Sequence, residues 1–142
     1  MTPTSLELLA VASVLVTFSG LPGLAFPSGR APAQRIATVL HVLGCVLGTA
    51  AAAWALAGDA VTIRLAWPLP GGSVTFSLDR LSAFFLVPVF VVSGLGAIYG
   101  EGYWAEARHP KNGRKLRCFY GLATGSLALV MVAGDAWSFL VG

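Results

Sequence analysis

The sequence predicts an all-α polytopic membrane protein with four transmembrane helices, the start of a fifth, and a β-hairpin between the second and third helices. Three observations predict this class. The 142 residues are 56% hydrophobic and only 11% charged, whereas roughly a quarter of the residues in a soluble domain are charged. The apolar residues form long runs, and the mean hydropathy is +0.79. The basic residues lie in short gaps between these runs rather than in one patch, which disfavours a nucleic-acid partner.

Four apolar runs approach the length of about 20 residues that a transmembrane helix needs. None has Asp, Glu, Lys or Arg in its interior. The first run is interpreted as an uncleaved span and not as a signal peptide, because no basic segment precedes it and it exceeds the apolar core of a signal peptide. The expected helices comprise residues 6–26, 36–57, 81–99 and 118–134, and a fifth begins at residue 136.

The segment between the second and third helices predicts a β-hairpin. Apolar residues alternate with others in VTIRLAW and again in SVTFSL, and a period of two is typical of strands. The intervening PLPGG, residues 68–72, would make the turn. An irregular loop with chance alternation is the alternative. Asp79 follows the second strand and is expected to cap the third helix by accepting backbone N–H bonds.

The orientation follows from the basic residues, because short cytoplasmic loops are enriched in Lys and Arg. Seven of the nine lie in the gaps before the second and fourth helices, and two lie in the gap that holds the hairpin. The loops of residues 27–35 and 100–117 are therefore predicted to be cytoplasmic, with the N-terminus and the hairpin outside. The seven are Arg30, Arg35, Arg108, Lys111, Arg114, Lys115 and Arg117, and the two are Arg64 and Arg80.

Within the helices, small residues recur at a spacing of four, which allows helices to approach closely. The G-x-x-x-G steps are Gly44 and Gly48, Gly96 and Gly100, and Gly121 and Gly125.

Few ionisable residues lie at membrane depth, where proton transport needs them. His41, near the expected start of the second helix, is the one candidate inside a span, and a histidine titrates near neutral pH. A hydrogen-bonded packing role is the alternative for His41. Asp79 and Asp135 lie near the interfaces and are either structural or part of a proton path, and His109 in the basic loop is expected to be solvated. No catalytic, metal-ligating or cofactor-binding residue is assigned, and no cofactor is expected.

Two stretches resemble a known family. FSLDRLSAFFLVPVF, residues 76–90, and CFYGLATGSLALVMVAGDAWSFLVG, residues 118–142, are similar to the antiporter-like membrane subunits of respiratory complex I, multisubunit sodium/proton antiporters and energy-converting hydrogenases. The Leu-Asp-x-Leu-Ser block at residues 78–82 carries the match, together with the aromatic start, the small-residue middle and the Asp at the end of the fourth helix. The WPLPGG loop before this block looks most like hydrogenase-4 component B, the formate hydrogenlyase membrane subunit. The sequence departs from the family at Arg80, where Gly is common, and at Ala136, where Asn is common.

The resemblance implies a proton-translocating subunit of a membrane-bound hydrogenase or NADH:quinone oxidoreductase-type complex. Its partners would be the lipid bilayer of a bacterial inner membrane and the other membrane subunits of that complex. In this family the fifth helix continues with a Trp-Glu pair whose Glu belongs to the proton pathway, and later helices supply the remaining relay residues. The sequence stops at Gly142, before that position. Residues 1–142 are therefore expected to be a single membrane domain, the N-terminal scaffold part of a longer subunit and not catalytic alone.

Two alternatives remain open. One is a self-contained, small four-helix membrane scaffold or assembly protein, in which the last seven residues lie as a cap at the outer interface. The other is a subunit of a multisubunit sodium/proton antiporter, which shares the fold of the first interpretation and differs in its partners.

Overall fold

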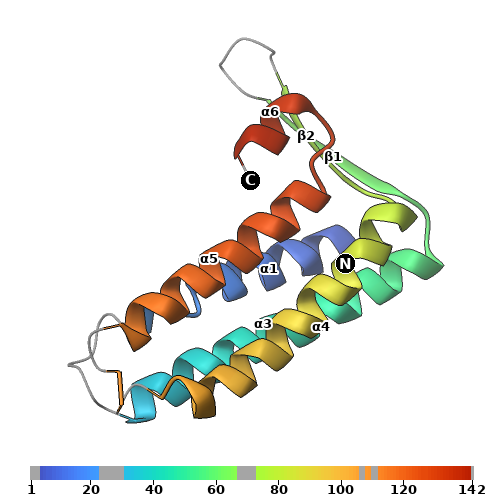
Figure 1. Cartoon of the computed structure of the whole chain (residues 1–142). Coiled ribbons are helices and arrows are strands. Elements are labelled where there is room, and N and C mark those ends of the chain that lie inside the picture. Colours follow the sequence, from blue (N-terminus) through green and yellow to red (C-terminus); the bar gives the residue numbers. More distant parts are fainter. Residues whose placement is uncertain (1–3, 23–30, 67–72, 106–107, 110–111, 142) are drawn as a thin grey trace.

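The structure, a computed structural model, describes residues 4–22, 31–66, 73–105, 108–109 and 112–141. This part of the chain is mostly helical, with one small two-stranded sheet. In Figure 1 the long helices lie side by side, and the sheet extends from one end of them beside a short C-terminal helix.

The first helix, α1 (Ser5–Phe18), begins with a capping box. The Thr4 N–H donates to the Glu7 carboxylate over 2.8 Å, and the Glu7 N–H donates to the Thr4 hydroxyl over 3.2 Å. Each side chain thereby satisfies a backbone donor that the first helical turn leaves without a partner.

The continuous helix expected over residues 6–26 is wrong at its C-terminal end, because α1 ends at Phe18. The N–H and the hydroxyl of Ser19 both donate to the Val16 carbonyl, and Gly20 disfavours continuation of the helix. After the turn at residues 19–20, Leu21 and Pro22 are helical again. Residues 23–26 lie outside the described part. With 14 residues α1 is about 21 Å long, shorter than the apolar core of a bilayer.

The helices α3 (Ala31–Ala57) and α4 (Arg80–Tyr103) are both longer than the apolar runs that predicted them. Their extra turns carry polar residues that hold the two helices together: the Gln34 side chain donates to the Glu101 carbonyl over 2.9 Å, and Arg35 lies 3.9 Å from the Glu101 carboxylate. Both helices are long and apolar enough to cross a membrane.

The helix α5 (Gly113–Met131) starts five residues before the predicted one and ends three residues before it, and the short α6 (Ala136–Val141) begins where the fifth helix was expected. The early start adds a basic first turn, GRKLR, and the early end frees residues 132–135 to meet the sheet. Neither α1 nor α5 reaches the length and hydropathy of a span within the described residues. Four spans therefore stay a prediction, whereas a helical fold with two candidate spans is found.

The hairpin is confirmed. The strands β1 (Val61–Ala66) and β2 (Ser73–Leu78) pair antiparallel, with Val61 opposite Leu78. The turn expected at residues 68–72 lies outside the described part. Leu78 is buried, and Val61 and Phe76 pack against the same core, so this end of the hairpin rests on the helices.

The helix order in space follows from the contacts: α1 lies against both α3 and α5, and α4 lies against α3 and more loosely against α5. Glycines mark the closest approaches. A Cβ on Gly44 would lie 2.6 Å from the Val16 side chain of α1, and one on Gly48 would lie 2.6 Å from the Phe90 ring of α4. Gly121 of α5 faces the Val16 carbonyl in the same way, whereas Gly100 faces open space among the described residues. In two of the three G-x-x-x-G steps, both glycines therefore lie at a contact with another helix.

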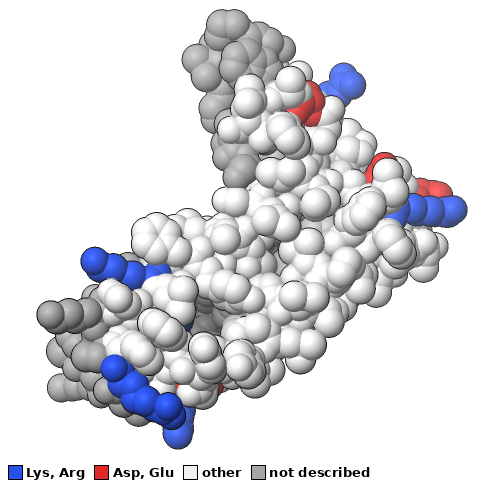
Figure 2. All heavy atoms as spheres, in the orientation of Figure 1, with Lys and Arg blue, Asp and Glu red and all other residues white. Residues whose placement is uncertain are grey.

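Charged side chains gather at the two ends of the helices, and the middle of the face drawn in Figure 2 carries none. Large apolar side chains are more than half exposed on every long helix, for example Val14, Val46, Val92 and Phe119. In water such a surface would be costly, because soluble proteins rarely expose apolar patches of this extent. The end that holds the hairpin is called the hairpin end below, and the end that holds Arg35, Arg114, Lys115 and Arg117 is called the basic end.

Candidate functional site

A cluster of polar side chains lies inside the apolar bundle, and each long helix contributes to it or to its edge. His41 of α3 stands at the centre, with Ser19 directly after α1, Ser93 of α4 and Thr124 of α5 around it. All four side chains are buried. Because α3 begins earlier than expected, His41 lies nearly three turns inside the helix rather than near its start.

Both ring nitrogens of His41 have hydroxyl partners. Nδ1 lies 3.1 Å from the Ser19 oxygen, and Nε2 lies 2.9 Å from the Ser93 oxygen. The Ser19 hydroxyl donates to the Val16 carbonyl over 2.7 Å and therefore accepts from His41 Nδ1–H. In the neutral ring Nε2 then accepts the Ser93 hydroxyl proton. The network thus assigns the tautomer with the proton on Nδ1.

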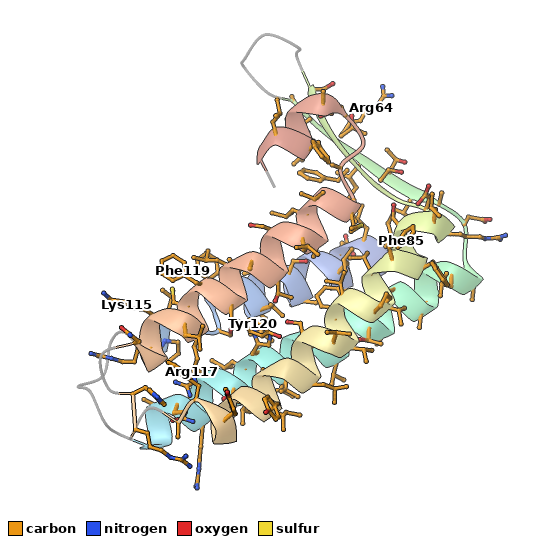
Figure 3. All side chains as sticks on the ribbon, in the orientation of Figure 1. Arg64, Phe85, Lys115, Arg117, Phe119 and Tyr120 are labelled. Carbon is orange, nitrogen blue, oxygen red and sulfur yellow. The ribbon has the colours of Figure 1, made fainter. Side chains whose placement is uncertain are left out.

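Ser93 also joins α4 to α5. Its oxygen lies 2.6 Å from the Thr124 hydroxyl oxygen, and the Thr124 hydroxyl can donate to the Tyr120 carbonyl over 3.0 Å. The Tyr120 hydroxyl in turn donates to the Ser93 carbonyl over 3.1 Å, and its ring lies 5.2 Å from the His41 ring. Figure 3 shows Tyr120 on the side of α5 that faces α3 and α4, and Phe119 on the opposite side.

A cavity of about 230 Å³ lies beside the cluster. Ser19, His41 and Tyr120 line it where it meets the cluster, and Leu116 and Arg117 line it farther toward the basic end. Of the described residues in its wall, Arg117 is the one with a fixed charge. The cavity therefore connects the region of His41 with the basic end of the bundle.

Arg117 joins the first turn of α5 to the C-terminal end of α4. Its guanidinium donates to the Gly113 carbonyl over 3.2 Å and to the Trp104 carbonyl over 3.4 Å. The Trp104 ring stacks on the His109 ring, with the ring centroids 3.8 Å apart. His109 is therefore half-buried against an aromatic ring, and the expectation that it is solvated is wrong.

Asp79 caps α4, as its position predicted. Its carboxylate accepts the Ser82 N–H over 2.7 Å. The hydrogen bond from the Ser82 backbone holds the pKa of the Asp79 carboxyl below its usual range. Asp79 is exposed and does not belong to the His41 cluster.

Asp135 joins the sheet to the end of α5. Its carboxylate accepts the Thr75 N–H over 2.5 Å, and the Gly134 N–H donates to the Thr75 carbonyl over 2.9 Å. The Ser77 N–H donates to the Val132 carbonyl over 2.8 Å, so residues 132–135 extend the hairpin by a strand-like segment. Of the three polar candidates from the sequence, two are thus structural anchors at the hairpin end, and His41 alone lies in a buried cluster.

Sequence reasoning missed Ser19, Ser93, Tyr120 and Thr124. The signal that could have found them is a hydroxyl residue inside an apolar run at the same depth as His41, because such residues form hydrogen bonds between membrane helices. Among the described residues, no three His, Cys, Asp or Glu side chains gather in a way that could hold a metal ion.

Comparison with protein-family models gives no match for this chain. Comparison with curated proteins gives no match either. The arrangement itself allows two kinds of behaviour. The hydroxyls can lock four helices together, and the imidazole can exchange a proton with water that enters the cavity.

Proposed function

We propose that this chain is the N-terminal part of an antiporter-like, proton-translocating membrane subunit of a membrane-bound hydrogenase or a complex I-like oxidoreductase. In this proposal the four long helices form a scaffold beside the helices that carry the main proton relay. The hairpin lies at the outer surface, and the loops that contain residues 27–35 and 100–117 face the cytoplasm.

The observation that carries the proposal is the contact between the two stretches that resemble the family. Residues 76–90 comprise the end of β2 and the first part of α4, and residues 118–142 include most of α5 and all of α6. They meet where Phe76 pairs with Ala133 and where Ser77 donates to Val132. The two segments, which residues 91–117 separate in the sequence, therefore contact each other directly, as expected if both derive from one family.

Charge placement supports the membrane arrangement. The described basic residues of the predicted cytoplasmic loops lie together at the basic end, and Arg64 and Arg80 lie at the hairpin end. The surface between these ends is apolar on every long helix. Such a band matches lipid or neighbouring apolar subunits, because only groups without exposed charge are stable at that depth.

The experiment that tests the proposal identifies the partners. The chain, tagged at its N-terminus in its native genomic context, is extracted from membranes in a mild detergent and purified. The proposal expects stoichiometric recovery of hydrogenase or NADH dehydrogenase subunits. Recovery of cation/proton antiporter subunits would instead support the antiporter alternative. Recovery of the chain alone as a stable species would contradict the proposal.

Coding DNA gives a second, independent test of the family assignment. If the chain belongs to this family, a reading frame should encode a Trp-Glu pair and further apolar spans after the codon for Gly142. Finding no such frame in any of the three frames would contradict the assignment.

A self-contained membrane scaffold is the second candidate, and one observation favours it. The helix α6 packs beside β2 and the end of α5, as a cap on the hairpin end would. Its Phe139 and Leu140 side chains are exposed there, and aromatic residues favour the level of the membrane interface. A chain that inserts, folds and purifies without partners would support this candidate.

A further inference from the structure

The His41 cluster is a chain of hydrogen bonds that ends at a backbone carbonyl on each side, and a carbonyl oxygen accepts a hydrogen bond but cannot donate one. At one end the Ser19 hydroxyl donates to the Val16 carbonyl, and at the other the Thr124 hydroxyl faces the Tyr120 carbonyl. Four side chains lie between these two carbonyls, and five contacts join the whole chain. Each contact needs one proton.

A neutral cluster is one proton short. With a neutral imidazole, the histidine and the three hydroxyls supply four protons for the five contacts. The deficit falls at Ser93 and Thr124, because Ser93 donates to His41 Nε2 and Thr124 then donates either to Ser93 or to the Tyr120 carbonyl. With an imidazolium, Nε2–H donates to Ser93, Ser93 donates to Thr124, and Thr124 donates to the carbonyl. All five contacts are then hydrogen bonds.

The groups that face His41 do not supply this proton. From α5, Tyr120 already donates to the Ser93 carbonyl, and Arg117 lines the same cavity. On α3 itself, the Cys45 thiol lies within hydrogen-bonding reach of Ser93, which adds one proton and one contact and leaves the deficit unchanged. From α1 and α4 the described groups at the cluster are the hydroxyls of Ser19 and Ser93.

The cavity offers a path for the missing proton. It has His41 in its wall and reaches toward Arg117 at the basic end. Its volume of about 230 Å³ is sufficient for water molecules. Arg35 and His41 are six residues apart on α3, so the ring lies about 9 Å along the helix from the charges of the basic end.

We propose that His41, Ser19, Ser93 and Thr124 form a proton-binding site that is loaded from the basic end through this cavity. The proton is transferred from a hydronium ion in the cavity to His41 Nε2, so that one O–H bond breaks and a water molecule remains. The Ser93 hydroxyl then turns from Nε2 to Thr124, and the Thr124 hydroxyl turns to the Tyr120 carbonyl. The cluster gains one positive charge, and no bond other than N–H is formed. The site goes beyond the proposed function, which places the relay on other helices.

Nitrogen-15 NMR of the full chain in lipid vesicles tests the site directly. Labelled histidine is incorporated into a His109→Gln variant, so that His41 gives the two ring-nitrogen signals. Near pH 8 the proposal expects a proton on Nδ1 and none on Nε2. On acidification toward about pH 4, both nitrogens become protonated while circular dichroism reports unchanged helix. A proton on Nε2 alone near pH 8, or a ring that stays neutral to the acid end, would overturn it.

Two variants separate this site from simple packing. Ser93→Ala removes the acceptor of Nε2–H, and the midpoint of the His41 titration moves lower by about one pH unit, because a hydrogen bond to a charged group is stronger than a neutral one. Thr49→Ala is the matched control, since Thr49 donates to the Cys45 carbonyl within α3 and lies outside the cluster. An equal shift in both variants would contradict the role of Ser93.

The route is tested by filling the cavity. Ala97 lines the cavity on α4, and Ala97→Phe is expected to slow proton exchange between His41 and water, measured from the line widths of the ring-nitrogen signals. Ala53→Phe places the same side chain in the groove between α3 and the far side of α4 and serves as the control. An exchange rate that is unchanged in Ala97→Phe would overturn the basic-end route, and the NMR result on the parent chain still decides the site. Neither measurement needs partner subunits, so failure of the proposed function leaves this test intact.

Discussion

The hydroxyl oxygens of Ser93 on α4 and Thr124 on α5 lie 2.6 Å apart at the centre of the bundle. These two helices otherwise touch less than α3 and α4 do, and an apolar groove opens between them beside this pair. The contact therefore closes the bundle at the side where packing is weakest. It also connects α5 with His41, because the Ser93 hydroxyl contacts both the Thr124 hydroxyl and the His41 ring.

Thr124→Val is expected to weaken the contact between α4 and α5, because it keeps the side-chain volume and removes the hydroxyl. The expected loss in free energy of unfolding is about 0.6 to 1.7 kcal/mol, the range of hydrogen bonds between membrane helices. Unfolding in detergent by heat or by SDS, followed by circular dichroism, measures it. Thr49→Val is the control, because the Thr49 hydroxyl bonds within α3. A loss in the control as large as in Thr124→Val would contradict this account.

Gly121→Ala is expected to separate α1 and α5. The added Cβ would lie 2.6 Å from the Val16 carbonyl oxygen, a backbone atom that cannot move aside without shifting a helix. Overpacking of this kind costs about 1 to 3 kcal/mol. Gly100→Ala is the matched control, because its Cβ meets no described atom within 4 Å, and alanine favours helix by about 1 kcal/mol. Destabilisation by the control alone would show that the glycine contacts are wrongly placed.

Asp135→Ala is expected to loosen the junction between the hairpin and α5. The Thr75 N–H loses its carboxylate acceptor, so its hydrogen exchange with solvent becomes faster. The central turns of α3 keep their protection, because they lie far from this junction along the helices. Hydrogen exchange read by mass spectrometry measures both regions in one experiment. Asp59→Ala, at an exposed position two residues after α3, is the control. Unchanged exchange at residues 73–78 in Asp135→Ala would contradict the anchor.

Asp79 gives the stability of α4 a dependence on pH. The pKa of its carboxyl is lower in the folded chain, so its stabilisation is present above the unfolded pKa of about 3.9 and is lost as the pH falls through the folded pKa. Asp79→Asn keeps a side-chain cap and removes this acid-side loss. Asp79→Ala costs about 1 kcal/mol at neutral pH as well. Thermal unfolding on both sides of this window compares the three proteins, and an Asn variant with the same acid-side loss as the parent would contradict the assignment.

The hairpin and the Asp79 cap could be predicted from the sequence because both depend on local pattern. Alternation of apolar residues predicts the strands, and the position of Asp79 directly before an apolar run predicts the cap. Helix ends were less predictable. Hydropathy marks where a helix is apolar, whereas α3 and α4 continue through polar turns that Gln34, Arg35 and Glu101 hold together. Conversely, α1 ends early at a serine that bonds back to its own helix.

The His41 cluster could not be predicted, because its members are far apart in the sequence. Ser93 and Thr124 are 31 positions apart, and His41 and Ser93 are 52 positions apart. The sequence indicates His41 alone, whereas Ser93 and Thr124 are ordinary helix residues when each is considered by itself. Only the packing of α3, α4 and α5 shows that three polar side chains reach the same depth, and the sequence carries no direct record of helix rotation.

The central proposal is that the bundle spans the membrane with the hairpin end outside and the basic end in the cytoplasm. The most direct measurement labels single cysteines in a Cys45→Ala, Cys118→Ala background with a membrane-impermeant maleimide. Arg64→Cys marks the hairpin end and Lys115→Cys marks the basic end, and both positions are labelled in Figure 3. The account predicts that intact spheroplasts label Arg64→Cys at once and Lys115→Cys only after lysis. Labelling of both before lysis, or the reverse order, would contradict it.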